Sequence, residues 1–392
     1  MRYKLGEIFN LQMGKTPDRH SPKFWNEGTE PWISIADLTK CNKYIENTAE
    51  KITATAVDES GIKIIPKNTV IMSFKLSIGK VAITPKEMYS NEAIMSFIDK
   101  GVLKIEPVYL YYLLMHKDWD TGTNKAVMGK TLNKASLSQM TVNIHGYSEQ
   151  LEIIKALDAA SSIIAARKQQ LTELDNLIKA RFVEMFGDPE INSFDWPVCT
   201  LKELVSFEPQ NGLYKPQSAY VQDGSGFPIV RIDAFFNGRI TNFSALKRLE
   251  CSESEVQRYL LQENDIVINR VNSIEYLGKC AHIKGLLEET VFESNMMRLH
   301  LDDTVMNAVF ATKLLCSQYI YKQIMIRAKK AVNQASINQQ DVLSFRMFVP
   351  PLELQEQFAA FVEQTDKSKV AVQKALDEAQ LLFDSLMQKY FG

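Results

Sequence analysis

The feature that most constrains this chain is an internal repeat at an offset of 205 residues. LIKARFVEMFG closes a segment at residues 177 to 187, and LFDSLMQKYFG closes the chain at 382 to 392. From Lys125, KAVMGKTLNKASLSQMTVNIHGYSEQ aligns without gaps with KAVNQASINQQDVLSFRMFVPPLELQ, which starts at Lys330. Only 11 of 63 paired positions are identical, so the argument depends on the shared order of motifs. The sequence predicts a tandem duplication.

Upstream landmarks occur twice in the same order. LGEIF (5 to 9) matches LKELV (201 to 205), and SNEAIMSF (90 to 97) matches SNMMRLHL (294 to 301). Between them, TVIMSFKLSIGKVAI matches DIVINRVNSIEYLGKCAHI. Turn signals separate short β-branched or aromatic runs, which is typical of a mixed α/β globule. Each copy is therefore predicted to have a strand-rich front part and a helical tail, with helices also over 107 to 118 and 305 to 330.

The two tails share a heptad pattern, and each is about 37 residues, or about 55 Å of helix. The repeating positions of the first stripe are Leu157, Ile164, Leu171 and Ile178, paired at the offset with Val362, Lys369, Leu376 and Phe383. A second stripe holds Thr365, Val372, Ala379 and Leu386. Heptads in equivalent register predict that the tails pack along a narrow coiled-coil seam, which Lys369 interrupts. The alternative is two amphipathic helices, each lying on its own domain.

These patterns predict an α+β fold with a pseudo-twofold internal repeat. Two homologous mixed α/β domains are separated by two long helices packed as an antiparallel coiled coil. The predicted bounds are 1–148 for the first domain, 149–187 for the first long helix, 188–352 for the second domain and 353–392 for the second long helix. The predicted seam consists of Leu157, Ile164, Leu171, Ile178, Val362, Val372, Leu376 and Phe383.

Charge and composition narrow the function classes only a little. The net charge of −2 gives no global attraction to nucleic acid, so a DNA-binding role would need local basic patches. Residues 1 to 148 hold 19 basic against 15 acidic side chains, whereas the two tails hold 9 against 13. No window approaches the roughly 18 apolar residues of a membrane span, which favours a cytoplasmic protein. The five cysteines form no C-x-x-C pair, so reduced thiols are expected and no metal site is predicted.

The familiar catalytic motifs are missing from the sequence. There is no G-x-S-x-G, H-E-x-x-H, G-x-x-x-x-G-K-[ST] or G-x-G-x-x-G motif, and the five histidines have no ligand spacing. Sites assembled from distant residues would escape such a search. A non-catalytic chain without a cofactor of its own is nevertheless the favoured reading.

Residues suited to reading DNA gather in equivalent loops of both copies. Cations contact phosphates, whereas guanidinium and amide groups recognise base edges. In the first copy the candidates are Lys15, Arg19, His20, Lys23, Lys75, Ser77, Lys80, Lys130, Asn133 and Lys134. In the second copy they are Lys215, Gln217, Arg231, Arg270, Asn272, Lys279, Asn333, Gln334, Asn338 and Gln339. A solvated loop residue is the competing interpretation of each one, and the correspondence between copies favours the set.

With these motifs in view, the chain resembles the specificity subunit of type I DNA restriction-modification systems. The resemblance covers essentially all 392 residues through the doubled layout. It also rests on an Ile-Gly-Lys turn ending at Lys80, weaker at Lys279, and on VPPLELQEQF at 349 to 358. That segment resembles the family's Pro-Pro-Leu-x-x-Gln entry to its long helices. The first copy departs from it, because His145 and Gly146 replace both prolines while Gln150 remains.

The resemblance implies a non-catalytic DNA reader. In the family, each globule is a target-recognition domain for one half of a split DNA site. The paired helices hold the globules apart and bind two methyltransferase subunits, whose S-adenosylmethionine is expected on that partner. A motor-nuclease subunit, when added, lets the assembly restrict unmodified DNA. Two other functions remain open from the residues alone: an adaptor that binds protein partners through both globules, and a self-contained DNA-modifying enzyme.

Overall fold

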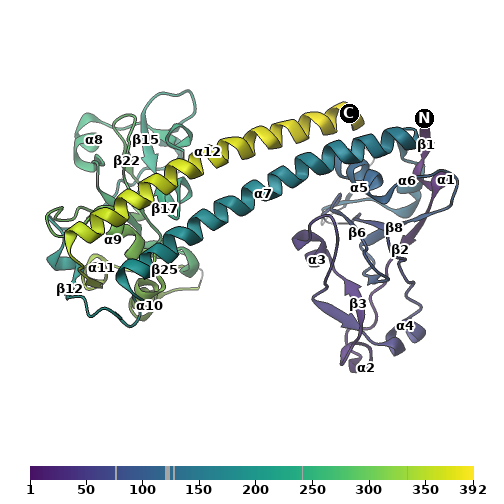
Figure 1. Ribbon diagram of the computed structural model, residues 1–392, viewed down its shortest axis with the longest axis horizontal. Helices are drawn as coiled ribbons and strands as arrows, with labels where there is room; N and C mark the ends of the chain where they lie inside the picture. The colour runs from purple at the N-terminus through teal and green to yellow at the C-terminus, as the bar shows by residue number, and fades with distance from the viewer. Residues whose placement is uncertain (76, 120–123, 127–128, 241, 333) are drawn as a thin grey trace. The chain divides into compact units, whose positions relative to one another are not determined.

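The computed structural model describes residues 1–75, 77–119, 124–126, 129–240, 242–332 and 334–392, with the backbone alone for 124–126 and 129–131. The chain forms two compact units (Figure 1). Unit 1 contains Met1–Gln169 and Gln373–Gly392, and unit 2 contains Gln170–Val372. The predicted domain bounds at 148, 187 and 352 stay a prediction, because the compact units divide each long helix between them.

Unit 1 is built around antiparallel strands in the order β2–β8–β5–β6. These strands are β2 Phe9–Met13, β8 Ile94–Asp99, β5 Val70–Ser73 and β6 Val81–Ile83. A second sheet runs β4–β3–β7, with β4 Glu50–Ile52, β3 Glu30–Ile33 and β7 Tyr89–Ser90. Two separate pairs are β1 Arg2–Lys4 with β11 Thr141–Asn143, and β9 Asn124–Ala126 with β10 Gly129–Thr131. The short helices are α1 Leu5–Ile8, α2 Pro22–Trp25, α3 Ile35–Lys40, α4 Ala54–Ser60, α5 Pro107–His116 and α6 Lys134–Gln139.

Unit 2 repeats this plan with additional strands at the edges of both sheets. Its main sheet runs β13–β23–β19–β21–β17–β16, which are Gln210–Asn211, Met296–Leu299, Ile266–Asn269, Cys280–His282, Gly238–Ile240 and Phe235–Phe236. The second sheet runs β14–β18–β15–β22, which are Tyr220–Val221, Lys247–Leu249, Phe227–Val230 and Val291–Phe292. A third runs β20–β25–β24, which are Val271–Asn272, Ala335–Ser336 and Lys329–Lys330. The remaining pair is β12 Val198–Thr200 with β26 Arg346–Phe348.

The helices of unit 2 fall at the same places in the order. They are α8 Glu253–Tyr259, α9 Ala308–Leu315, α10 Gln318–Arg327 and α11 Gln339–Leu343. Short 3-10 turns are η1 Leu201–Glu203, η2 Gln217–Ala219, η3 Ile232–Ala234, η4 Phe243–Ala245 and η5 Ile274–Tyr276. The predicted helical stretch 305 to 330 is thus two helices, since Cys316 and Ser317 separate α9 from α10.

The two units share one topology. The order β2–β8–β5–β6 corresponds to β13–β23–β19–β21, and β4–β3–β7 corresponds to β18–β15–β22. The β1–β11 pair corresponds to β12–β26, and the β9–β10 ribbon corresponds to β24–β25. Corresponding elements follow one another in the same chain order, as a duplication requires.

One glutamine per unit shows the duplication at the level of single atoms. The Gln150 side chain accepts a hydrogen bond from the backbone N–H of Glu106 and donates to the carbonyl oxygens of Lys104 and His145. Gln355 makes the same set, accepting from the N–H of Asn307 and donating to the carbonyls of Val305 and Pro350. Both side chains are buried, at 1% and 0% exposure. Each therefore ties the start of a long helix to the loop before α5 or α9.

The long helices are α7, Tyr147–Phe186, and α12, Leu352–Phe391. In unit 2, Phe182 near the end of α7 packs edge-on against Phe358 near the start of α12, with ring centroids 5.4 Å apart. In unit 1, Leu157 near the start of α7 shares a core with Met387 near the end of α12. The helices therefore run antiparallel and pack together, as predicted.

The terminal Phe-Gly motif of each long helix ends on a globule. Phe186 is 1% exposed and lies 4.6 Å, ring centroid to centroid, from Phe310 of α9. The ring centroid of Phe391 lies 5.6 Å from that of Tyr109 in α5. Gly187, which follows Phe186, takes a φ of 79°, a left-handed conformation that a side chain would resist. The motif is repeated because each unit receives one helix end.

Candidate nucleic-acid interface

The loop before α2 in unit 1 and α2 itself hold their cations close to acidic or backbone partners. Arg19 forms an ion pair with Glu50, with N–O distances of 2.5 and 3.1 Å. Its guanidinium carbon lies 4.0 Å from the ring centroid of Trp25. Lys23 pairs with Glu59, and Lys15 donates to the carbonyl of Ser60, while His20 is exposed. The aromatic support fixes the Arg19 plane, and the carboxylate partners reduce the local positive charge.

Hydrogen bonds fix the backbone of the Ile-Gly-Lys turn in unit 1. Gly79 has a φ of 88° and its N–H donates to the carbonyl of Ser73. The Ser73 hydroxyl accepts from the N–H of Lys80 at 3.0 Å, and the Lys80 ammonium donates to the hydroxyl of Thr39. Lys75 is half-buried beside the Phe74 ring, and Ser77 is exposed. The turn therefore exposes Ser77 and leaves Lys75 half-buried.

The same turn recurs in unit 2 with more burial. Gly278 has a φ of 77° and donates to the carbonyl of Asn269. Arg270 donates from Nε to the carbonyl of Ser294 at 3.1 Å, and burial lowers the pKa of its guanidinium. Lys279 donates to the carbonyl of Ile232, and burial lowers its pKa as well. These two cations are partly engaged in holding the fold.

Two predicted base readers cap helices. Asn133 accepts from the N–H of Ser136 at the start of α6, and Asn338 accepts from the N–H of Asp341 at the start of α11. An N-cap of this kind stabilises a helix by about 1 kcal/mol. Lys134, beside the first cap, is exposed. The paired asparagines therefore have a structural role that accounts for their repetition.

The remaining predicted residues of unit 2 divide between two places. Lys215 pairs with Glu255 at 2.8 Å, Arg231 pairs with Glu293 at 3.6 Å, and Gln217 is exposed in η2. Elsewhere, Gln339 donates to the carbonyl of Pro209, and Gln334 is exposed beside β25. Asn333 and the side chain of Lys130 lie outside the described residues.

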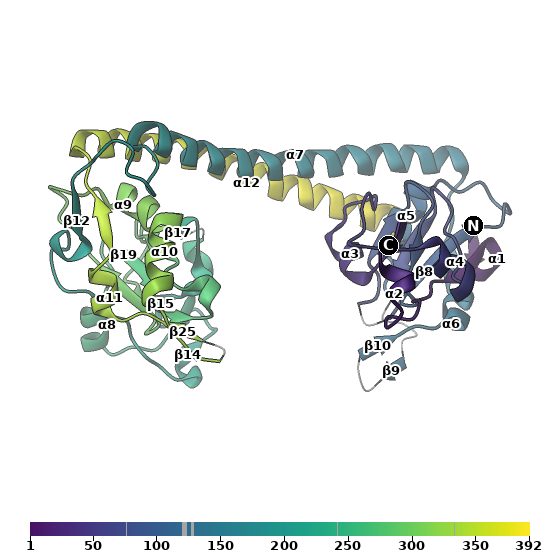
Figure 2. The ribbon, with the colours of Figure 1, turned by 90° about the horizontal axis from the view of Figure 1, so that it is seen from below.

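The β24–β25 ribbon gathers the second of these groups. Asn272 in β20 is opposite Ala335 in β25, and the carbonyl of Arg270 accepts from the N–H of Ile337. Asn272, Arg270 and Gln334 therefore lie around one small sheet. Figure 2 shows β25 at the end of unit 2 away from the long helices, and β9 and β10 in the same situation in unit 1.

Sequence reasoning missed the most accessible cations of this sheet. Lys329 and Lys330 form β24 and are both exposed, and Val332 beyond them is 99% exposed. No acidic residue occurs between Glu293 of the preceding strand region and Asp341 except Asp302 and Asp303. The sequence could have indicated Lys330, because it aligns with Lys125 at the start of the repeat. This ribbon is the strongest candidate contact surface for a polyanion in unit 2.

The predicted seam residues occupy the facing sides of α7 and α12 to different degrees. Leu157, Ile164, Ile178, Val362 and Val372 are buried, at 0 to 9% exposure. Leu171, Leu376 and Phe383 are half-buried. Thr365 and Ala379 of the second stripe are buried too, and so is Lys369, at 5% exposure. Lys369 therefore continues the buried stripe that the sequence suggested it would interrupt.

Two absences apply to the described residues. Among them, no helix is both long and apolar enough to cross a membrane. Within the same part of the chain, no group of three or more His, Cys, Asp or Glu side chains is arranged to hold a metal ion.

Comparison with known proteins identifies relatives across the whole chain. A "Type I restriction enzyme MjaIX specificity subunit" from Methanocaldococcus jannaschii is 23% identical over 98% of this chain and 91% of its own length. A "Putative type I restriction enzyme MjaX specificity subunit" from the same organism is 29% identical over 53% of this chain. In that comparison the chain spans about half of the relative, at 48%. The EcoKI specificity subunit of Escherichia coli is 24% identical over 66% of this chain and 59% of its own length.

Solved structures share the fold. The S subunit of a type I restriction-modification system from M. genitalium matches with a TM-score of 0.59 and 14% identity, covering 100% of this chain and 96% of that one. A chain from a study of complex assembly and conformational transition of the type I R-M system matches with a TM-score of 0.55 and 16% identity, over 100% and 97%. The family model "Type I restriction modification DNA specificity domain" matches residues 1–176 and 194–379. The chain therefore belongs to the type I restriction modification DNA specificity domain family, with one copy of the domain in each half.

Proposed function

We propose that this protein is a DNA-reading specificity subunit in which each globule recognises one half of a split site. The observation that carries the proposal is the doubled unit itself, repeated down to the Gln150 and Gln355 hydrogen bonds. Two readers on one chain bind at high effective concentration only where both half-sites stand at the matching separation. Family membership supports the same reading.

The β24–β25 ribbon supplies the reading element for the second half-site. A two-stranded ribbon fits the width of the major groove. Lys329 and Lys330 can neutralise phosphates, and Val332 offers an apolar tip suited to the methyl group of thymine. The corresponding β9–β10 ribbon gives unit 1 the same element.

The paired helices act as a spacer and as a docking surface in this proposal. A pseudo-twofold chain presents equivalent surfaces twice, so two copies of one methyltransferase subunit can bind without dimerisation of the chain itself. The chain is a non-catalytic member of a cytoplasmic complex. S-adenosylmethionine binds to the methyltransferase, and a motor-nuclease subunit adds restriction.

Exchange of one recognition unit tests the proposal. Residues 1–148 are replaced by the corresponding segment of a relative, and the hybrid is expressed with its methyltransferase. Sequencing of methylated DNA should show one altered half-site and one retained half-site. Alteration of both halves would contradict independent reading by the two units.

The salt dependence of DNA binding distinguishes the proposed DNA reader from a protein-binding adaptor. DNA affinity that depends on phosphate contacts falls steeply as salt rises, whereas a protein–protein contact made by the globules need not follow that slope. A purified chain that transfers labelled methyl groups to DNA without a partner would instead favour the self-contained enzyme.

A further inference from the structure

A buried lysine lies in the seam of unit 2 where an apolar residue is the rule. Lys369 of α12 follows Val362 and Thr365 at heptad spacing, and its side chain is 7% exposed. Its ammonium lies 2.5 Å from Oδ1 of Asp175 on α7 and 3.2 Å from Oδ1 of Asp366 on α12. The two long helices are thus joined by a charge pair inside their contact.

The second globule holds both aspartates from the other side. The Asn237 amide donates to Oδ2 of Asp175 at 2.8 Å, and Arg239 lies 3.1 Å from Asp366. Asn237 and Gly238 form the Asn-Gly turn between β16 and β17, with φ values of 49° and 85°. The Lys313 ammonium of α9 donates to the carbonyl of Asn237. Three elements of the globule therefore converge on the charges of the helix pair.

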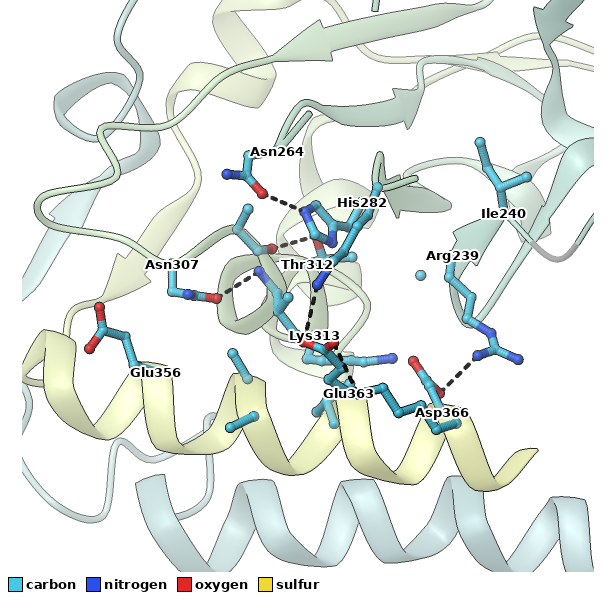
Figure 3. A pocket seen from close by; sticks show the side chains of 18 of the residues that line it. Arg239, Ile240, Asn264, His282, Asn307, Thr312, Lys313, Glu356, Glu363 and Asp366 are labelled. Carbon is cyan, nitrogen blue, oxygen red and sulfur yellow. Dashed lines mark hydrogen bonds and ion pairs between the residues drawn. The ribbon is translucent and has the colours of Figure 1, made fainter. Parts of the chain in front are cut away.

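This joint is polar and hollow. A cavity of about 740 Å³ lies between α12 and the β17, β21 and α9 residues that face it. Figure 3 shows Arg239 reaching Asp366 at one side of the cavity, with Glu363 and Glu356 further along α12. Lys284 bridges to Glu363 at 3.1 Å. These directed ion pairs add to the apolar contacts that Phe182, Phe186 and Phe358 of the two long helices make with the same globule.

The corresponding positions in the other half of the repeat are not charged partners. At the offset of 205 residues, Lys369 corresponds to Ile164 and Asp175 corresponds to Gln380. An α7 helix paired with another α7 would set Ile164 against Asp175, and two α12 helices would set Lys369 against Gln380. The first pairing leaves the partly exposed Asp175 without Lys369, and the second leaves the buried Lys369 ammonium without its interhelical carboxylate, which is costly. Of these three pairings, that of α7 with α12 joins Lys369 to Asp175.

We propose that Lys369, Asp175 and Asp366 fix the axial register of α7 against α12 and the seat of the second globule on them, and are therefore specificity-determining residues for the spacing between half-sites. The proposal rests on the proposed function for its link to DNA. A polar residue at one core position is an established way for a coiled coil to specify register at a cost in stability. Apolar side chains in place of a buried ion pair can keep the protein stable, but they do not specify which register the two helices adopt.

The test replaces the whole pair with apolar side chains, Lys369→Met with Asp175→Leu. The melting temperature is expected to equal or exceed that of the unaltered protein, because the buried ammonium and its interhelical carboxylate are removed together while Asp366 keeps Arg239 as its partner. With the methyltransferase bound, the variant is offered duplexes that carry the selected half-sites at varied spacing. The proportion of off-length spacers should rise about tenfold. Lys374→Gln with Glu378→Gln removes an exposed charge pair from the same helix and should leave the spacing unchanged.

A second measurement is independent of DNA. Spin labels placed at Leu177 on α7 and Gln364 on α12 report one interhelical distance within unit 2. The distribution should be narrow in the unaltered chain and broadened in the double apolar variant. A stable variant that keeps both the narrow distribution and the single spacer would overturn the proposal. If the unaltered complex selects no split site, the proposed function fails, and the distance measurement still decides the role of Lys369.

Discussion

The two ends of the helix pair share one framework and differ in what fills it. In unit 2, Phe182 and Phe186 of α7 meet Phe310 and Phe358 in a buried aromatic cluster. In unit 1, Phe391 of α12 is half-buried and contacts the rings of Tyr109, His116 and His145. The same architecture is therefore kept while the aromatic packing at the two helix ends has diverged.

The glutamine hydrogen bonds explain why the framework survives. Gln150 and Gln355 each satisfy one N–H and two carbonyl groups of the backbone, and a side-chain amide carries both the acceptor and the donors that these bonds need. Apolar positions tolerate exchange of one hydrophobic residue for another of similar volume. Polar staples are thus retained in both halves, whereas the packed aromatic residues differ.

The largest expected loss of stability comes from the aromatic cluster of unit 2. Phe186→Ala should lower the free energy of unfolding of unit 2 by about 3–5 kcal/mol, because the ring is 1% exposed. Phe391→Ala should cost about half as much, because its ring is half-buried. Urea denaturation of both variants measures the difference. Equal losses would contradict the unequal packing of the two ends.

The glutamines should behave alike where the aromatic residues do not. Gln150→Ala and Gln355→Ala each leave a buried N–H and two carbonyls short of a partner, which should cost about 3 kcal/mol. The two losses are expected to agree within about 0.5 kcal/mol. A large loss for one glutamine and almost none for the other would show that the repeated hydrogen bonds are not equivalent in energy.

Acid should destabilise unit 2 through His282. Burial lowers the pKa of this imidazole to about 4, against about 6.5 in an unfolded chain. The unfolded state therefore binds the proton first as pH falls, and stability is lost between about pH 6.5 and 4, by about 3 kcal/mol. Backbone pairing places Ile83 at the corresponding position of unit 1. His282→Ile should flatten the pH profile over this range, and an unchanged profile would assign the acid sensitivity to other groups.

The smallest expected effect concerns the ribbon of unit 2. Lys329→Ala with Lys330→Ala should weaken DNA binding and reduce the slope of log affinity against log salt by about 2, one for each lost phosphate contact. Lys367→Ala, an exposed cation on α12, serves as the control. Titrations at several salt concentrations compare the three proteins. A slope equal to that of the unaltered protein would remove the ribbon from the interface.

The duplication and the helix pair could be predicted from the sequence because their signals are periodic. Seven-residue spacing marks the seam, and equal spacing in both tails implies that they meet. The sequence alone did not identify Asp175 as the partner of Lys369. Asp175 lies 194 residues away, and only the antiparallel register brings the two together.

The interface was harder to predict because several roles select the same residue types. Asn133 and Asn338 are each followed three residues later by a serine or aspartate that completes a capping box, so their capping role was readable. Arg19 and Lys23 carry carboxylate partners from segments more than 30 residues away, which composition does not reveal. Accessibility, which distinguishes Lys329 and Lys330, depends on the folded ribbon.

The most direct test of the central claim inserts one heptad into both α7 and α12 and maps the methylated sites. Each insertion lengthens its helix by about 10.5 Å, which corresponds to about three base pairs of DNA. The half-site sequences should remain and the spacer between them should change. An unchanged spacer, with both half-sites still recognised, would contradict the account of the helix pair as the element that sets the separation.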